Sequence, residues 1–393
     1  MNSNYNIQKH SVSHKFARSN AYLISTILAV LFLTNLNSRD LHLSSSTKAT
    51  ETSIDSSATI GKRASRGQLK NRTITLVHVG KAGGLTIKAS TSLYCRLPRG
   101  RRKPEEIEKY IKRRFNDANN TLALQLKGYF HMWAYDEEEL QQSTSFLFTL
   151  RNPVDRIISA YRYSHPNNCK KKSAIYRPKA CENAKYGKDP KSTFHLIFSQ
   201  CFPSAGMEDF AQSTMSPWNT EPAQFHNFTD TQRVDCRRIA REAAMGSYST
   251  GFQHMYYNYD YYVNKTIRAF PETEIFGVRT EQEWEDMTAL DIYLGGTGQF
   301  KRKGTHVSHG SEFYDPSPLS SVAYQKLCCV LEHEIQVYIE LINRVDNLDD
   351  TAKVEGIDLI KEKCNIASSW SEWRAQCRNQ IDKDWAILEP KTS

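Results

Sequence analysis

A short glycine-containing segment, residues 78–86, has the residue types needed to bind an anion. It reads His-Val-Gly-Lys-Ala-Gly-Gly-Leu-Thr and follows a β-branched stretch. Glycines at a strand-to-helix turn let backbone N–H groups close around an anion, and the helix N-terminus adds a favourable dipole. Lys81 adds a positive charge and Thr86 a hydroxyl, but Lys81 precedes the glycine pair, so this is not a Walker A loop. The segment therefore indicates an anion site, with a purely structural turn as the alternative.

A second segment with suitable chemistry covers residues 150–161, Leu-Arg-Asn-Pro-Val-Asp-Arg-Ile-Ile-Ser-Ala-Tyr. We expect Arg151 at the carboxyl end of a strand, where open α/β sheets bind ligands. Ser159 follows two helical turns later, close to the face of Val154 or Asp155. An Arg and a Ser so placed can bind one phosphate together. The residues alone leave open a second interpretation, in which Arg151 pairs with Asp155 and Ser159 only packs.

Taken together and in this order, the two segments resemble those of the Golgi carbohydrate sulfotransferases. The closest pattern is that of the heparan sulfate and uronyl 2-O-sulfotransferases, and the 6-O enzymes are also similar. In that family the first segment holds the 5′-phosphosulfate of 3′-phosphoadenosine-5′-phosphosulfate (PAPS), and the second holds its 3′-phosphate. The resemblance covers roughly residues 72–345. The matching positions are Lys81, Gly83, Gly84, Thr86, Arg151, Pro153, Arg156 and Ser159.

The resemblance implies a set of donor-binding residues. A basic loop at residues 300–306 is similar to the loop that closes over the nucleotide in related enzymes, and Thr280 begins a segment similar to one that follows a late family strand. Leu85 stands where the family commonly has a hydroxyl residue, so one side-chain contact to the donor is lost while the backbone N–H groups remain. The expected donor-binding residues are Lys81, Ala82, Gly83, Gly84, Leu85, Thr86, Arg151, Ser159, Arg302, Lys303 and Gly304.

Two residues are expected to act on the reacting groups. A sugar hydroxyl is a poor nucleophile until its proton is removed, and His is the side chain best suited to remove it near neutral pH. His131 occupies a place similar to that of the catalytic His of the 2-O and 6-O enzymes, and Lys81 would stabilise charge on the leaving phosphate. The alternative is a packed His131 among aromatic neighbours, with His306 and His309 as the next candidates. This scheme requires no metal, and the sequence shows no cluster of metal ligands.

Strand and helix patterns alternate along the chain. We expect strands at residues 73–79, 122–126, 146–150 and 274–278, which have β-branched, alternating or continuously apolar composition. We expect helices at 104–115, from Pro153 onward and at 321–345, and Asn152 should cap the second of these. Such alternation predicts an α/β fold, here a P-loop-like three-layer sandwich with a central, mainly parallel sheet.

Cysteines and sequons indicate an oxidising compartment. There are nine cysteines, and Cys169–Cys181, Cys201–Cys236 and Cys364–Cys377 are plausible bridges, although connectivity does not follow from sequence. Asn-x-Ser/Thr triplets occur at Asn71, Asn119, Asn227 and Asn264. Both observations favour the secretory pathway.

The N-terminal region supports a Golgi membrane location. Basic residues precede an apolar run, which predicts a single-pass type II anchor with a luminal catalytic domain, and a cleaved signal peptide is the alternative. We expect the following division: cytosolic tail 1–20, signal-anchor 21–36, Ser/Thr-rich stem 37–70, catalytic domain 71–349 and helical C-terminal extension 350–393.

Net charge bears on the partner. The 52 Lys and Arg exceed the 43 Asp and Glu by nine, which favours anionic partners. We expect a carbohydrate acceptor, an anionic polysaccharide or a glycoprotein glycan, and no nucleic acid; an oligomer is compatible with the sequence. The expected activity is PAPS-dependent sulfuryl transfer to a carbohydrate hydroxyl. Two other functions stay open: a P-loop-type nucleotide kinase or NTPase, and a catalytically inactive luminal glycan-binding protein of the same fold.

Overall fold

A computed structural model describes the part of the chain that carries most of the expected elements. The chain divides into two units, residues 1–63 and 64–393, and every described residue lies in the second. The expected helix at 104–115 and the expected anchor at 21–36 lie outside the described residues. The described residues are 73–84, 87, 121–131, 137–165, 192–204, 206–215, 225, 227–249, 251–299, 318–367 and 369–388.

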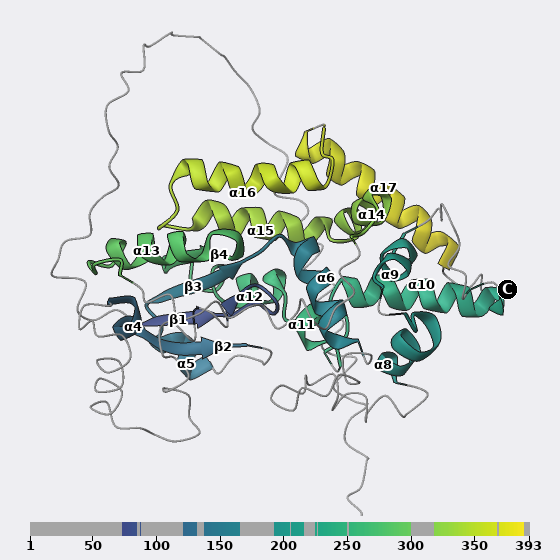
Figure 1. The fold of residues 1–393 in the computed structure, drawn as a ribbon, viewed down its shortest axis with the longest axis horizontal. Helices are drawn as coiled ribbons and strands as arrows, with labels where there is room; N and C mark the ends of the chain where they lie inside the picture. Colours follow the sequence, from purple (N-terminus) through teal and green to yellow (C-terminus); the bar gives the residue numbers. More distant parts are fainter. Residues whose placement is uncertain are drawn as a thin grey trace, which may run out of the picture. The chain divides into compact units, whose positions relative to one another are not determined.

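A parallel sheet of four strands forms the centre of the described fold (Figure 1). The strands are β1 (Ile74–Val77), β2 (Leu126–Phe130), β3 (Ser145–Leu150) and β4 (Glu274–Arg279), in the order β2-β1-β3-β4. All three pairings are parallel. Every residue of β1 and β3 is buried, as expected for strands that are covered on both faces. The sheet and its flanking helices confirm the predicted α/β fold.

Two apolar clusters cover the two faces of the sheet. On one face, Leu76 and Leu147 pack with Leu122 of α4 (Thr121–Gln125) and with α13 (Glu283–Tyr293). On the other, Phe146 and Phe148 belong to the larger core with α6 (Pro153–Ser164), α12 (Tyr259–Lys265) and α15 (Glu332–Arg344). Alternate residues of β3 thus serve opposite layers, which is the period of a strand.

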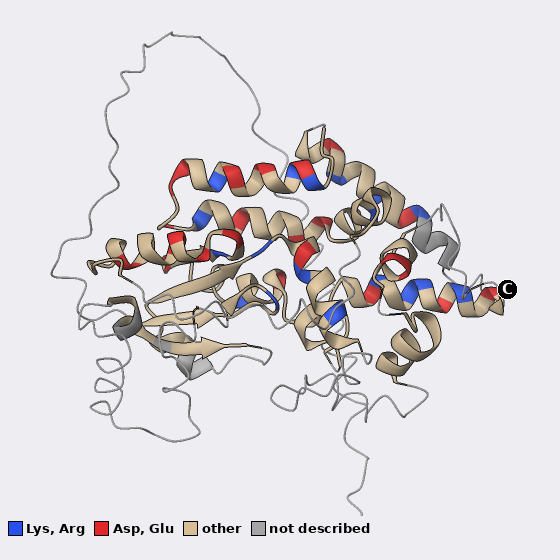
Figure 2. Cartoon of the chain, viewed as in Figure 1, with Lys and Arg blue, Asp and Glu red and all other residues tan. Residues whose placement is uncertain are grey.

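The remaining described helices complete these layers. Figure 2 shows that charged residues gather on the helices and that the strands are mostly uncharged. The remaining helices are α5 (Glu137–Gln142), α8 (Thr193–His195), the π-helix Leu196–Cys201, α9 (Glu208–Ser213), α10 (Asp230–Ala244), α11 (Gln253–Tyr256), the 3₁₀ turn Thr280–Gln282, α14 (Ser321–Val330), α16 (Asp350–Lys363) and α17 (Trp370–Leu388).

Strand order defines where a ligand can enter. The chain passes from β1 to β2 on one side, and then to β3 and β4 on the other side of β1. The connections therefore diverge at the carboxyl ends of β1 and β3. In open α/β sheets a crevice forms at such a switch point, and ligands bind there. Both chemically suitable segments follow these two strands.

The start of α6 agrees with the sequence-based expectation. Asn152 caps the helix, because its side-chain oxygen accepts a hydrogen bond from the Val154 N–H at 2.9 Å. Pro153 occupies the first helical position, where its missing N–H is not needed. The cap sets the point at which the chain turns from the tip of β3 into α6.

The predicted strand at residues 122–126 is wrong. Residues 122–125 belong to α4, and β2 begins only at Leu126. Leu122 and Leu126 are both buried, and a spacing of four residues fits one face of a helix as well as it fits alternation. The Leu122 N–H is held by Asp291 Oδ1 of α13 at 2.9 Å, a contact from far along the chain that favours the helical turn.

The predicted helix at 321–345 is divided in two. α14 ends at Val330 and α15 begins at Glu332, with Leu331 fully buried at the break. The two parts pack on different neighbours. α14 contacts α9 and α17, whereas α15 contacts α12 and α16, so one straight helix would not make both sets of contacts.

Three disulfides link described helices. Cys201–Cys236 confirms one predicted bridge, whereas Cys169 and Cys181 lie outside the described residues. The predicted Cys364–Cys377 bridge is wrong, because each of these cysteines pairs with one of two adjacent cysteines on α14. Adjacent helical residues point about 100° apart, so they reach different neighbouring helices. The observed pairs are Cys328–Cys364 and Cys329–Cys377.

Within the part of the chain that the structure describes, no helix has both the length and the hydropathy needed to cross a bilayer.

Candidate functional site

The loop after β1 is tightly curled. Lys81 and Gly83 both have positive φ, +68° and +84°, a conformation that is uncommon for a side-chain-bearing residue such as Lys81. The Arg151 guanidinium stabilises it, since its NH1 donates to the Lys81 carbonyl at 2.9 Å. The two segments selected from the sequence thus meet through a direct hydrogen bond.

Close contacts with imidazole rings explain why this loop contains glycines. A Cβ added to Gly84 would lie 2.3 Å from the His78 ring, and one added to Gly80 would lie 2.8 Å from the His254 ring. A Cβ on Gly83 would lie 3.1 Å from Thr280 Oγ1, in addition to the unfavourable φ. The backbone therefore lies directly against these side chains, and larger residues would push the loop away from the strand ends.

Lys81 is the cation of the loop. Its Nζ lies 4.2 Å from the centroid of the Tyr163 ring, at cation–π distance. Burial lowers the pKa of Lys81 to about 8, and the neighbouring Arg151 guanidinium contributes to the lowering. Two cations held close together provide a strong attraction for an anion.

Arg151 is positioned by a tyrosine from α12. Its backbone N–H donates to the Tyr259 hydroxyl at 2.8 Å, and that hydroxyl lies 3.2 Å from the Thr149 carbonyl and 3.1 Å from the Arg151 carbonyl. Burial raises the pKa of Tyr259 well above its ordinary value, so the phenol stays protonated and can donate to one of these carbonyls. At the tip of β4, Thr280 donates to the Leu150 carbonyl at 2.9 Å.

Ser159 and Asp155 lie on the partly exposed face of α6. The structure pairs Arg151 with the Lys81 carbonyl, whereas Asp155 bonds with Tyr324 and Lys363. The alternative in which Arg151 pairs with Asp155 is therefore not observed. Among the described residues, no side-chain hydrogen bond involves the Ser159 hydroxyl, so it is available to a ligand.

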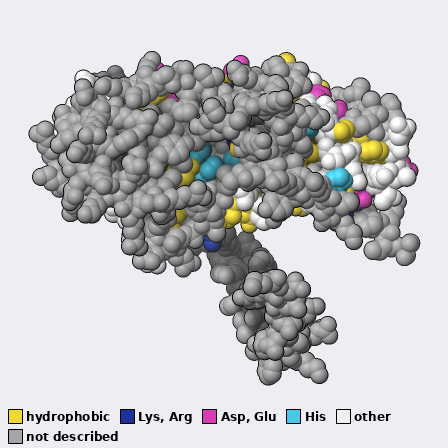
Figure 3. All heavy atoms as spheres, turned by 60° about the horizontal axis from the view of Figure 1, so that its bottom comes forward, with side chains coloured by type: hydrophobic (Ala, Val, Ile, Leu, Met, Phe, Trp, Pro, Cys, Tyr) yellow, Lys and Arg dark blue, Asp and Glu magenta, His cyan; other side chains and the backbone are white. Residues whose placement is uncertain are grey.

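His131 follows β2 and belongs to a group of three histidines. Its Nδ1 lies 3.0 Å from the His78 carbonyl oxygen, which can only accept, so Nδ1 carries the proton and Nε2 keeps its lone pair. The His131 ring stacks on His78 at 4.0 Å, and the His254 ring lies 5.4 Å away. His78 Nδ1 is in turn 3.0 Å from the Tyr129 hydroxyl. Figure 3 shows histidine side chains reaching the surface of the described part beside hydrophobic atoms.

Arg156 has a different role from that of Arg151, although the family resemblance includes both. Its side chain is fully buried, forms an ion pair with Glu334 of α15 at 2.6 Å and donates to the His254 carbonyl at 2.5 Å. Arg156 therefore holds α6, α11 and α15 together and contacts no open space at the strand tips.

Several residues of the site carried no signal in the sequence. His254, Tyr259 and Tyr163 belong to no motif, and Tyr259 alone lies in a run of tyrosines, between residues 256 and 262. Conversely, the structure says nothing of seven predicted candidates, which lie outside the described residues. These are Leu85, Thr86, Arg302, Lys303, Gly304, His306 and His309.

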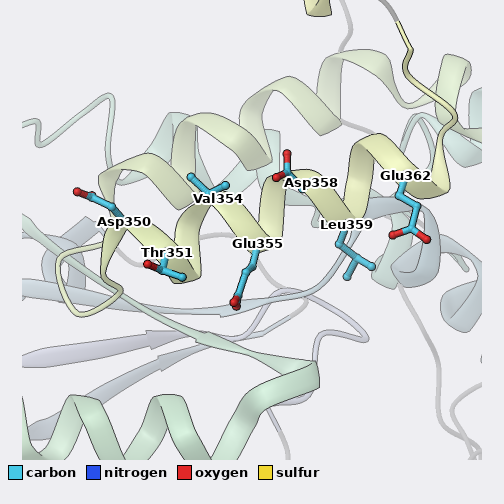
Figure 4. Close-up of a pocket in the computed structure, with 7 residues that line it drawn as sticks. All are labelled: Asp350, Thr351, Val354, Glu355, Asp358, Leu359 and Glu362. Atoms are coloured by element: carbon cyan, nitrogen blue, oxygen red, sulfur yellow. The ribbon is translucent and has the colours of Figure 1, made fainter.

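A groove along α16 is a poor alternative site for an anion. Its lining residues all come from that one helix (Figure 4). Four of them are acidic, so they would repel a phosphate or sulfate. The lining residues are Asp350, Thr351, Val354, Glu355, Asp358, Leu359 and Glu362. The described residues also hold no group of three or more His, Cys, Asp or Glu side chains arranged to bind a metal ion.

Comparison with known proteins identifies one family for part of the chain. Residues 70–243 match the model of the sulfotransferase family, and this range contains both the Lys81 loop and the Arg151–Ser159 segment. No curated protein and no solved structure matches the chain. The family match singles out no subtype. It supports placing this part of the chain in the sulfotransferase family and, in general terms, assigning it the transfer of a sulfuryl group.

Proposed function

We propose that this protein transfers the sulfuryl group of PAPS to a carbohydrate hydroxyl in the secretory pathway, as a Golgi membrane protein. The observation that carries the proposal is the meeting of three features at one edge of the sheet. Lys81 and Arg151 are joined by a hydrogen bond at the switch point, and His131 contacts His78, which leads into the Lys81 loop.

The residues present fit the PAPS donor. The glycine loop lies close against the strand ends, where a larger residue would displace it, and its cation Lys81 suits the 5′-phosphosulfate. Arg151 and Ser159 suit the 3′-phosphate. Arg151 precedes the cap of α6, and Ser159 lies on the partly exposed face of that helix. Charge-assisted hydrogen bonds to phosphate are the strong ones, and Arg is well suited to form them.

Sulfuryl transfer then needs one base and one charge stabiliser. His131 Nε2 takes the proton of the acceptor hydroxyl, and the acceptor oxygen forms the new bond to sulfur. As the bond between sulfur and the 5′-phosphate oxygen breaks, its electron pair stays on that oxygen. Lys81 stabilises the resulting charge. This is an in-line displacement comparable to phosphoryl transfer, in which positioning and electrostatics supply most of the catalysis.

The proposed compartment is supported by the cysteines and sequons. Six of the nine cysteines form the three disulfides, and disulfides persist in oxidising compartments. Asn227 and Asn264 are exposed, as a glycosylated asparagine must be. A net charge of +9 suits an anionic glycan acceptor.

Transfer of labelled sulfate from PAPS to a panel of glycans, phenols and peptides tests the activity. We expect incorporation into a glycan and a loss of about 10²–10⁴-fold in turnover for His131→Ala, with binding of the product 3′-phosphoadenosine-5′-phosphate (PAP) retained. His333→Ala is the matched control, since this histidine is exposed on α15. Incorporation only into phenols or peptides would refute the carbohydrate acceptor, and an unchanged His131→Ala would refute the base.

Glycosidase treatment of protein from a secretory host tests the compartment. We expect a mobility shift that decreases in Asn227→Gln, and thiol titration that finds the six bridged cysteines unreactive. Absence of any glycan together with nine reactive thiols would exclude a luminal location.

A further inference from the structure

Lys363, at the end of α16, lies beside the face of α6 that carries Ser159. We propose that Lys363 is a further donor-site residue, which neutralises Asp155 next to the 3′-phosphate position. The inference rests on the proposed function, because it concerns the phosphate assigned to Arg151 and Ser159. It lies outside the family match, which ends at residue 243.

Asp155 stands in an unfavourable place for a protein that binds a phosphate on α6. Asp155 and Ser159 are four residues apart in this helix, so they share a face. That face is partly exposed, whereas Val154, Ile157 and Ala160 on the other side are buried. A carboxylate beside Ser159 would repel an incoming phosphate unless its charge were balanced.

Two groups from the C-terminal helices bind the Asp155 carboxylate. Lys363 Nζ lies 2.6 Å from Asp155 Oδ2, and the Tyr324 hydroxyl of α14 donates to Asp155 Oδ1 at 3.1 Å. Both carboxylate oxygens are therefore occupied, one of them by a full positive charge. The pair is only partly exposed, with 36% and 20% of the two side chains accessible.

Arg151 belongs to the same electrostatic neighbourhood. Burial raises the pKa of the Tyr324 phenol, the Asp155 carboxylate raises it further, and the Arg151 guanidinium lowers it. Tyr324 is thus within reach of both the Asp155 charge and the cation expected to bind the phosphate. An uncompensated Asp155 would oppose Arg151 at the place where the donor needs positive potential.

A disulfide holds the end of α16, and with it Lys363, close to α14. The next residue, Cys364, is bonded to Cys328 of α14, and Cys328 is four residues after Tyr324. Tyr324 and Cys328 therefore lie on one face of α14. On that face Tyr324 binds the Asp155 carboxylate, and Cys328 binds the end of α16 through the disulfide. In Figure 2, α16 carries charges of both signs, and its neighbouring Lys361 pairs with Asp358.

Binding of PAP and of AMP, which lacks the 3′-phosphate, tests this role. We expect Lys363→Ala to weaken PAP binding by about tenfold, the order for one partly screened charge, and to leave AMP binding unchanged. Lys363→Arg should restore PAP affinity, and Lys361→Ala is the matched control that should change neither. Isothermal calorimetry measures all four proteins.

A double-mutant cycle separates electrostatics from packing. If Lys363 acts by neutralising Asp155, the effect of Lys363→Ala on PAP affinity should disappear in an Asp155→Asn background. Equal losses of PAP and AMP affinity would show a structural role and overturn the inference. If the wild-type protein prefers PAP to AMP and Lys363→Ala keeps that preference, the inference about Lys363 is overturned and the proposed phosphate site stands. A wild-type protein with no such preference would overturn the proposed phosphate site as well.

Discussion

The strand-tip site and the C-terminal helices are stabilised in opposite ways. At the site, polar groups form hydrogen bonds to backbone carbonyls, as in the Arg151–Lys81 and His131–His78 contacts. In the helices α14 to α17, two disulfides act together with an apolar core, and a buried ion pair joins α15 to α6. The two regions therefore differ in what holds them: hydrogen bonds to the backbone at the site, and covalent cross-links in the C-terminal helices.

Two arginines from one motif express this contrast. Arg151 leaves most of its guanidinium available at the site, whereas Arg156, five residues later, is fully buried against Glu334. Substitutions in the two regions should therefore separate stability from donor binding, and the largest effect should come from the buried pair.

Arg156→Ala should lower the free energy of unfolding by about 3–5 kcal/mol, because it leaves Glu334 as an uncompensated buried charge. Urea unfolding measures the change. Arg238→Ala is the control: Arg238 pairs with Asp235 at 2.7 Å but both side chains are more than 40% exposed, so the loss should be about 0–1 kcal/mol. Equal losses in the two variants would contradict the structural role assigned to Arg156.

The two adjacent disulfides sharpen the comparison. Removing Cys329–Cys377 by a double Ser substitution should cost roughly 2–5 kcal/mol of stability and leave PAP affinity intact. Removing Cys328–Cys364 should cost a similar amount and also weaken PAP binding, because it frees the end of α16 next to Lys363. Denaturant unfolding and calorimetry on both variants decide this, and identical PAP affinities would remove the link between that bridge and the site.

Arg151→Ala should affect donor binding rather than stability, the opposite of Arg156→Ala. PAP binding should weaken by about 2–4 kcal/mol, as for truncation of one partner of a desolvated charge pair, with little change in unfolding free energy. Arg268→Ala serves as a control, since this arginine pairs with Glu340 on the surface. PAP affinity that survives Arg151→Ala would move the phosphate site elsewhere.

The smallest expected effect concerns pH. Because burial lowers the pKa of Lys81 to about 8, the side chain is charged below that pH and loses its proton above it. Donor affinity should therefore fall by about tenfold between pH 7 and pH 9. Lys81→Arg, which stays charged over this range, should abolish the pH dependence. A wild-type profile as flat as that of the Arg variant would mean that Lys81 does not contact the donor.

Local patterns in the sequence were sufficient for much of the fold. The segments predicted as strands at 73–79, 146–150 and 274–278 correspond to β1, β3 and β4, and the Asn152-Pro153 pair correctly marks the start of α6. The pattern at 122–126 misled, because five residues with alternate leucines satisfy a strand and a helical turn equally, and a contact with Asp291 decides between them.

By itself the sequence determined the strand-end positions of Lys81 and Arg151, since strand composition, glycine spacing and helix capping act over a few residues. Only the tertiary structure decided that β1 and β3 are neighbours, that His78 and His254 surround His131, and that Arg156 is buried against Glu334. It also decided the pairing of the α14 cysteines and the place of Lys363. These contacts join segments far apart in the chain, and their geometry depends on how whole layers pack rather than on any local pattern.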